Sequence, residues 1–91
     1  MAHYIITYDL HNQRTYPPVW SLLESWGAVR LLESVWVATT SSSTVQVRDA
    51  LQGVIDKDDS IAVVELKTGS DWACVRAKDD GVNWLRKNLR K

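Results

Sequence analysis

The sequence has a single cysteine, no phenylalanine and no net charge. The lone thiol of Cys74 excludes a disulfide framework and a thiolate metal site. Its apolar neighbours, Trp72, Ala73 and Val75, favour the interpretation that Cys74 is a small residue of the core. The balanced charge argues against a protein that binds nucleic acid over its whole surface, because such domains are usually clearly basic.

Long apolar runs are also missing. The sequence has no stretch that resembles a signal peptide or a membrane span, so we expect no membrane association and a cytoplasmic location. A chain of 91 residues predicts one domain over residues 1–91. A domain of this size buries about two-thirds of its unfolded surface, which leaves a thin margin of stability.

Charge is unevenly distributed along the chain. Basic residues gather at the carboxyl end, where they form either a solvated helix face or a contact for nucleic acid. Acidic residues gather in the middle, without the glycine and the closing glutamate of a calcium loop, and we interpret them as a solvated helix end. The basic residues are Arg86, Lys87, Arg90 and Lys91, and the acidic residues are Asp56, Asp58 and Asp59.

Periodicity and turn residues predict alternating strands and helices. The first helix opens at Pro17–Pro18 and ends before Gly27, and the second opens within the serine run 41–44 and ends at the acidic residues 56–59. A last helix is capped by Asp79 or Asp80. The predicted strands are Tyr4–Leu10, Ala28–Leu32, Ser34–Thr39, Ile61–Leu66 and a short one at Trp72–Val75.

This order predicts an α+β fold, a ferredoxin-like βαββαβ sandwich with a short extra strand and helix at the carboxyl end. The segments Ala28–Leu32 and Ser34–Thr39 are two strands joined by a turn near Glu33 or one bent strand. Ile61–Leu66 is apolar on both faces, which favours a central strand. Both main helices lie on one face, and a bare apolar second face predicts a homodimer. The candidates for that face are Ile5, Thr7, Val35, Val37 and Val63.

Asp9 is the strongest candidate for a functional residue. It ends a strand of β-branched and aromatic residues, where a carboxylate requires a partner, solvent or a metal. Its oxygen atoms suit Mg²⁺ or Mn²⁺, and the alternative is a cap on the N–H groups of Asn12 or Gln13. His11 shares the face of Asp9 if the strand continues that far. His11 is then a general base or a second ligand, and otherwise a surface loop residue.

Further polar and aromatic residues allow two interpretations each. Arg14 and Arg30 either contact phosphates or, for Arg30, form an ion pair with Glu33 or Glu65. Ser34 is better explained as a turn hydroxyl than as a site residue. The strand residues Trp36 and Trp72 either stack on bases or, as we favour, pack in the core or at a dimer contact.

Three short segments, in this order and spacing, resemble the CRISPR-associated Cas-two family of small ferredoxin-fold proteins. The first is the strand end Tyr8–Leu10, and the second is Gly27 followed by a strand and Ser34–Trp36, which is similar to the family's Ser-Val-Phe segment. The third is Asp58–Ser60 before the next strand. Together they span about residues 1–66.

The resemblance implies a homodimer that brings the two copies of Asp9 together near its axis to hold a divalent metal. It implies a metal-dependent endonuclease acting on RNA or DNA, with Asp9 as the residue that holds the metal. Our candidates for this activity are Asp9 and His11 as catalytic residues and Mg²⁺ or Mn²⁺ as the cofactor. The alternative is a non-catalytic dimer that binds nucleic acid or bridges protein subunits, with an adaptation integrase as a partner. Residues for nucleic-acid binding are then Arg14, Arg30, Arg86, Lys87 and Arg90.

The chain also departs from the family pattern. Only Arg14 stands where the family carries a basic run before the first helix, and Val37 stands where an acidic residue often follows the aromatic residue. Both departures weaken the expectation that the chain binds nucleic acid, and they suggest an outlying relative of the family.

Overall fold

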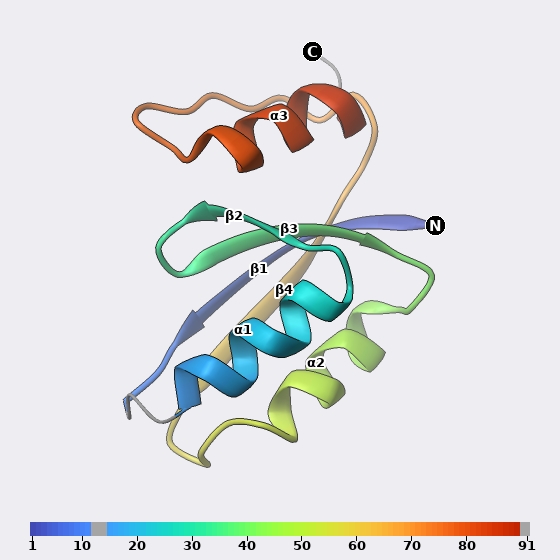
Figure 1. Ribbon diagram of the computed structural model, residues 1–91. Helices are drawn as coiled ribbons and strands as arrows, with labels where there is room; N and C mark the ends of the chain where they lie inside the picture. The colour runs from blue at the N-terminus through green and yellow to red at the C-terminus, as the bar shows by residue number, and fades with distance from the viewer. Residues whose placement is uncertain (12–14, 90–91) are drawn as a thin grey trace.

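The computed structural model describes residues 1–11 and 15–89 of the chain. Four strands form one sheet, with two helices on one face and a third helix on the other (Figure 1). The ferredoxin-like fold predicted from the sequence is confirmed in the element order. The elements are β1 Ala2–Asp9, α1 Tyr16–Ser25, β2 Val29–Leu32, β3 Val35–Thr40, α2 Thr44–Gln52, β4 Ser60–Leu66 and α3 Asp79–Asn88.

The sheet has the strand order β2-β3-β1-β4, and all its pairings are antiparallel. β1 is central, with Thr7 opposite Val35 of β3 and Asp9 opposite Ser60 of β4. The prediction that residues 61–66 form a central strand is wrong, because β4 lies at the edge. Its outer face stays half open, with Val64 53% exposed, so apolar residues on both faces did not signal a central position.

The two-helix face holds the larger core. Pro17 and Pro18 lie in the first turn of α1, directly after its first residue Tyr16, and Gly27 follows this helix with φ 73°. Ser43 begins α2 with a capping box, in which its hydroxyl accepts from the Gln46 N–H and the Gln46 side chain accepts from the Ser43 N–H. The fully buried side chains under these helices are Ile6, Val19, Leu23, Val47 and Leu51.

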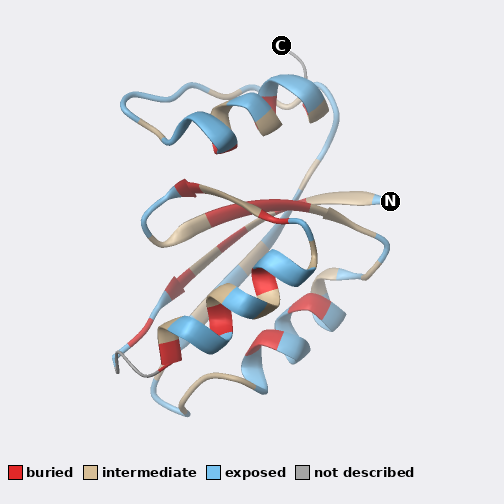
Figure 2. Ribbon diagram, in the orientation of Figure 1, coloured by how far each residue is buried: buried red, intermediate tan, exposed pale blue. Residues whose placement is uncertain are grey.

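The second face is not bare, which corrects the expectation from the sequence. α3 packs over β2 and β3, where Val37 is fully buried and Val35 lies against the Leu31–Leu85–Leu89 cluster (Figure 2). Ile5 and Thr7 lie on this face of β1, whereas Val63 packs into the opposite, two-helix core. α3 therefore leaves open only the half of the face that lies over β1 and β4.

The segment between β4 and α3 differs from its prediction. Trp72–Val75 is irregular and makes no strand, Cys74 is exposed rather than buried, and Val75 is 72% exposed. Lys78 is the N-cap of α3 and offers no side-chain cap, while Asp79 and Asp80 lie within the first turn. The negative charges of these two carboxylates stabilise the helix by their interaction with its dipole, and neither carboxylate acts as the N-cap.

Within the described residues, no helix is both long enough and apolar enough to cross a membrane.

Candidate functional site

Asp9 lies at the exposed carboxyl end of β1. Alternation along the strand puts it on the same face as Ile5 and Thr7, the face that α3 covers only in part. Among the described residues, no hydrogen bond or ion pair engages its carboxylate. An open cavity of about 190 Å³ adjoins it, lined by Thr7, Tyr8, Asp9, Ser60, Ile61 and Ala62. No cation lines this cavity among the described residues.

His11 does not share the face of Asp9 in the way a longer strand would require. β1 ends at Asp9, and His11 lies in the exposed loop that follows. Its backbone N–H donates to Asp59 Oδ1 at 2.8 Å. The alternative role for Asp9, a cap on the N–H groups of residues 12 or 13, lies outside the described residues, as does Arg14.

Asp59 joins two loops at this end of the sheet. Its Oδ1 accepts from the His11 N–H and its Oδ2 accepts from the Asp56 N–H at 2.9 Å. Partial burial raises the pKa of Asp59, but the hydrogen bonds from His11 and Asp56, the charge of His11 and a hydrogen bond from Thr15 outweigh it and lower the pKa below its ordinary value of 3.8. The prediction of a simple solvated helix end is therefore wrong for this residue.

The acidic residues 56, 58 and 59 form a second possible ligand group. Their oxygen atoms lie within 4.8 Å of one another, which is close enough to hold a divalent cation. Both oxygens of Asp59 already accept backbone hydrogen bonds. Exposed acidic groups are common without an ion, so this grouping alone defines no metal site.

The predicted basic residues do not come together around Asp9. Arg86 and Lys87 lie in the last turn of α3, where positive charge stabilises the helix dipole. Arg30 lies in β2, and its guanidinium forms an ion pair with Glu33, with 3.9 Å between Nη1 and Oε2. Of the two predicted partners of Arg30, Glu33 is confirmed, and Glu65 instead pairs with Lys67. Arg90 lies outside the described residues.

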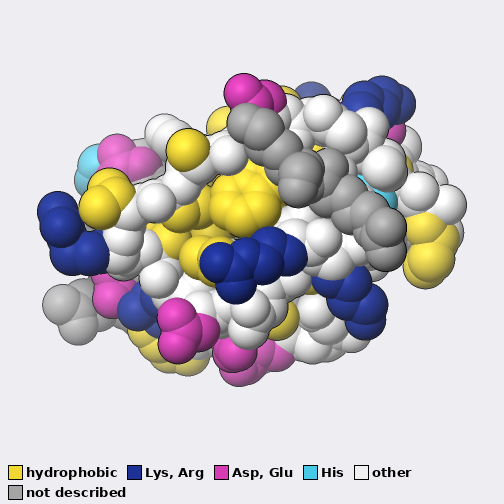
Figure 3. Space-filling view, turned by 90° about the horizontal axis from the view of Figure 1, so that it is seen from above, with side chains coloured by type: hydrophobic (Ala, Val, Ile, Leu, Met, Phe, Trp, Pro, Cys, Tyr) yellow, Lys and Arg dark blue, Asp and Glu magenta, His cyan; other side chains and the backbone are white. Residues whose placement is uncertain are grey.

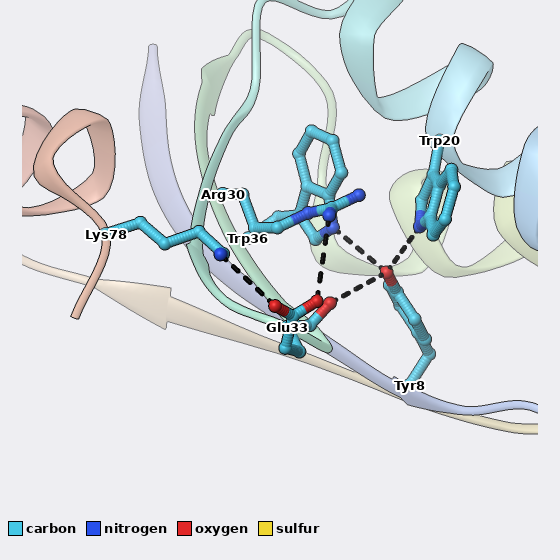
Figure 4. Close-up of polar contacts among 6 residues, drawn as sticks. All are labelled: Tyr8, Trp20, Arg30, Glu33, Trp36 and Lys78. Atoms are coloured by element: carbon cyan, nitrogen blue, oxygen red, sulfur yellow. Dashed lines mark hydrogen bonds and ion pairs between the residues drawn. The ribbon is translucent and has the colours of Figure 1, made fainter. Parts of the chain in front are cut away.

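A cluster that the sequence did not predict is centred on the Tyr8 hydroxyl (Figure 4). The hydroxyl accepts from Trp20 Nε1 at 2.8 Å and from Trp36 Nε1 at 3.1 Å. Tyr8 and Trp36 are buried, so the preference for Trp36 as a core residue is confirmed. These hydrogen bonds fix both indole rings, because each ring N–H has its acceptor.

Arg30 packs against the same two rings. Its Cζ lies 4.6 Å from the centroid of the Trp20 ring and 4.8 Å from that of Trp36. Glu33, in the turn between β2 and β3, also pairs with Lys78, with 3.2 Å between Oε1 and Nζ. We call the partly exposed part of this cluster the tryptophan–arginine surface, and its residues are Tyr16, Trp20, Arg30, Glu33 and Lys78.

The fold and the strand end together define a small ferredoxin-like domain that presents an accessible carboxylate at the end of its central strand. The model of the family described as CRISPR associated protein Cas2 matches residues 1–73. The chain therefore belongs to this family, here called the Cas2 family, and has a CRISPR-associated function. No solved structure matches the chain.

Proposed function

We propose that this Cas2 family member is a homodimeric, metal-dependent endonuclease that hydrolyses phosphodiester bonds of RNA or DNA. The accessible Asp9 carboxylate, with no engaged partner among the described residues, is the observation that carries the proposal. A charged group with room around it is available to bind a ligand, whereas a carboxylate that caps a backbone N–H, such as Asp59, is already engaged.

The donor set fits a hard divalent cation. A carboxylate oxygen is the ligand that Mg²⁺ and Mn²⁺ prefer, and such ions keep several waters. When bound at Asp9, the ion would activate a water and neutralise charge on the phosphate. His11 is the candidate to accept the proton of the attacking water, since it lies two residues from Asp9 in the adjoining loop.

A second copy of the chain would complete the site. One carboxylate per chain is a sparse ligand set, and two copies of Asp9 double it. The half of the sheet face that α3 leaves open includes Thr7, Ala62 and the half-exposed Val64, on the same side as Asp9. We propose this half-face as the dimer contact, because an apolar sheet face is stabilised by packing against a second one.

A nuclease screen with Mg²⁺ and with Mn²⁺ tests the proposal. We expect the wild-type chain to cleave RNA or DNA and Asp9→Ala to lose cleavage while it keeps its fold. Asp49→Ala is the matched control, since Asp49 is an exposed carboxylate on α2, on the opposite side of the sheet. Light scattering should give a dimer mass. Full cleavage by Asp9→Ala, or a monomer that cleaves, would contradict this function.

A second candidate is a non-catalytic dimer that binds nucleic acid or bridges an adaptation integrase. The absence of any cation among the described residues that line the Asp9 cavity favours it, since the cavity offers nothing to hold a phosphate. Its basic element is α3, although Lys and Arg side chains on this side of the molecule are dispersed among acidic ones (Figure 3). Charge reversal at Arg86 and Lys87 should then weaken binding and its salt dependence, with Asp9→Ala unchanged.

A further inference from the structure

We propose that the tryptophan–arginine surface binds one nucleotide of a single-stranded nucleic acid. This inference takes its class of ligand from the proposed function and names the contacts that the Asp9 cavity lacks. Aromatic faces, a held guanidinium and an exposed carboxylate lie together there, and these groups recognise a base and its phosphate.

The base would lie against Tyr16 and Trp20. Their ring centroids are 5.5 Å apart with a tilt of 38°, and both side chains are partly exposed at a cavity of about 280 Å³. Glu33 and Ser34 complete the lining. Stacking is tolerant of sequence, but a carboxylate distinguishes the edges of the bases. The amino group of cytosine lies at the corner of the ring and can donate to Glu33, whereas the imino N–H of thymine lies between two carbonyl oxygens that repel a carboxylate. The surface therefore favours cytosine over thymine.

The phosphate would lie at Arg30. Two indole faces hold the guanidinium, and its one ion pair among the described residues is the 3.9 Å contact to Glu33, whose side chain is 82% exposed. The Arg30 side chain is 26% exposed, and no hydrogen bond joins its N–H groups to another described residue, so they can donate to a ligand. Little side-chain entropy remains to be lost on binding. Lys78 adds a second cation beside the same carboxylate.

Acidic residues limit the strength of this site. The cavity of about 380 Å³ beside Arg30 is also lined by Glu24 and Asp80, which repel a phosphate. We therefore expect weak binding that depends on salt, and expect Glu24→Gln to tighten it.

The surface lies at the end of the sheet that also presents Asp9. The Tyr8 N–H donates to the Ser34 carbonyl at 3.3 Å, which joins the β2–β3 turn to the last residues of β1. A nucleic-acid strand held at the turn is thus at the same end of the sheet as the proposed metal ligand. Tyr8 faces the two-helix side and Asp9 the opposite side, so the nucleic acid would pass around this end of the sheet to reach the Asp9 site.

Binding is measured by quenching of tryptophan fluorescence in EDTA, with octamers of dC and dT and with a blunt DNA duplex. The chain should bind the dC octamer more tightly than the dT octamer. Glu33→Gln should weaken binding of the dC octamer by about fivefold or more, which is the lower end of the range for one hydrogen-bonded contact to a base. Arg30→Gln should weaken the binding of both octamers and make their affinity less dependent on salt concentration. Glu65→Gln is the matched control, because Glu65 of β4 also forms an ion pair with a lysine, Lys67. Unchanged thermal unfolding of Glu33→Gln would confirm that its loss is one of contact.

Each result bears on the proposal. Equal affinity for dC and dT that Glu33→Gln leaves unchanged, no binding of either octamer, or binding of the duplex alone would overturn it. Because the assay omits metal and needs no cleavage, it tests the nucleotide-binding surface separately from the proposed nuclease activity. An inactive chain that still shows the dC preference refutes the nuclease and keeps the surface, whereas an active chain whose Glu33 and Arg30 variants bind normally refutes the surface.

Discussion

The two faces of the sheet are stabilised to different extents. Counted over the described residues, the face under α1 and α2 buries eleven residues in one cluster, whereas the face under α3 buries four, with half-buried residues around them. α1 and α2 are each connected to the sheet at both ends by short loops, while α3 follows the irregular segment 67–78. The difference indicates that the two-helix side determines whether the chain folds and that α3 adds a separable layer.

Two backbone hydrogen bonds fix the ends of α3. The Lys78 N–H donates to the Leu31 carbonyl at 2.9 Å, and the Gly69 N–H donates to the Leu89 carbonyl at 2.8 Å. Trp72 packs beside this cluster, yet its buried Nε1 has no hydrogen-bond partner within residues 1–11 and 15–89. A buried donor without an acceptor is costly, so this layer is less well satisfied than the opposite core.

The largest expected effect lies in the two-helix core. Leu51→Ala removes a fully buried side chain of α2 and should cost about 2–5 kcal/mol of unfolding free energy. For a small domain this is a large part of the total of about 5–15 kcal/mol. Urea unfolding measures it, with Val45→Ala as the control, since Val45 lies on the same helix but is 52% exposed. Equal losses in both variants would show that this face is not the dominant core.

A smaller effect is expected at Gly81, where α3 lies directly against the backbone of β2. A Cβ there would lie 2.5 Å from Leu31 Cα and 2.8 Å from the Arg30 carbonyl oxygen, so Gly81→Ala must displace the helix. Overpacking of this kind costs about 1–3 kcal/mol. Helix propensity alone would make alanine the more stable residue. We expect faster hydrogen exchange at the Lys78 and Gly69 N–H groups and little change at β1.

Gly53→Ala is the control for this prediction. The nearest atom to its added Cβ would be the Ala50 carbonyl oxygen at 3.5 Å, an ordinary contact. If Gly81→Ala unfolds the whole chain at the same urea concentration by every probe, with all amides losing protection together, α3 is part of one cooperative unit and not a separable layer.

Local sequence signals predicted the part of the fold that they control directly. Pro17 and Pro18 opened α1, Gly27 ended it, and the serine run supplied the Ser43 capping box. The turn near Glu33 was also correct, since β2 and β3 form an antiparallel pair across it. Each of these features depends on residues close together in the chain, so the sequence contains them almost completely.

Features that depend on distant packing were not predictable in the same way. The bare face was wrong because where α3 packs is not determined by its own periodicity. The central position of residues 61–66 was wrong because the strand order β2-β3-β1-β4 places β4 at the edge. The burial of Cys74 was wrong because its segment forms no strand and lies exposed. The Tyr8 cluster was missed for the same reason, since it joins residues of β1, α1 and β3. The five tryptophans, each with an N–H to satisfy, were the signal that such a polar centre would exist.

The smallest effect is expected at Asp59, whose carboxylate joins two loops and belongs to neither core of the sheet. Because its pKa is lowered by folding, its contribution to stability is complete above the ordinary value of 3.8 and is lost as pH falls from there toward the lower folded value. Asp59→Asn should remove this dependence below pH 4 and speed amide exchange at His11 and Asp56, while the β1–β3 amides keep their protection. Asp58→Asn is the control, because Asp58 is an exposed carboxylate next to Asp59 in the same loop. Exchange that rises equally across β1 and β3 in Asp59→Asn would show that these loops are coupled to the core, and would remove the distinction between a structural carboxylate at Asp59 and an available one at Asp9.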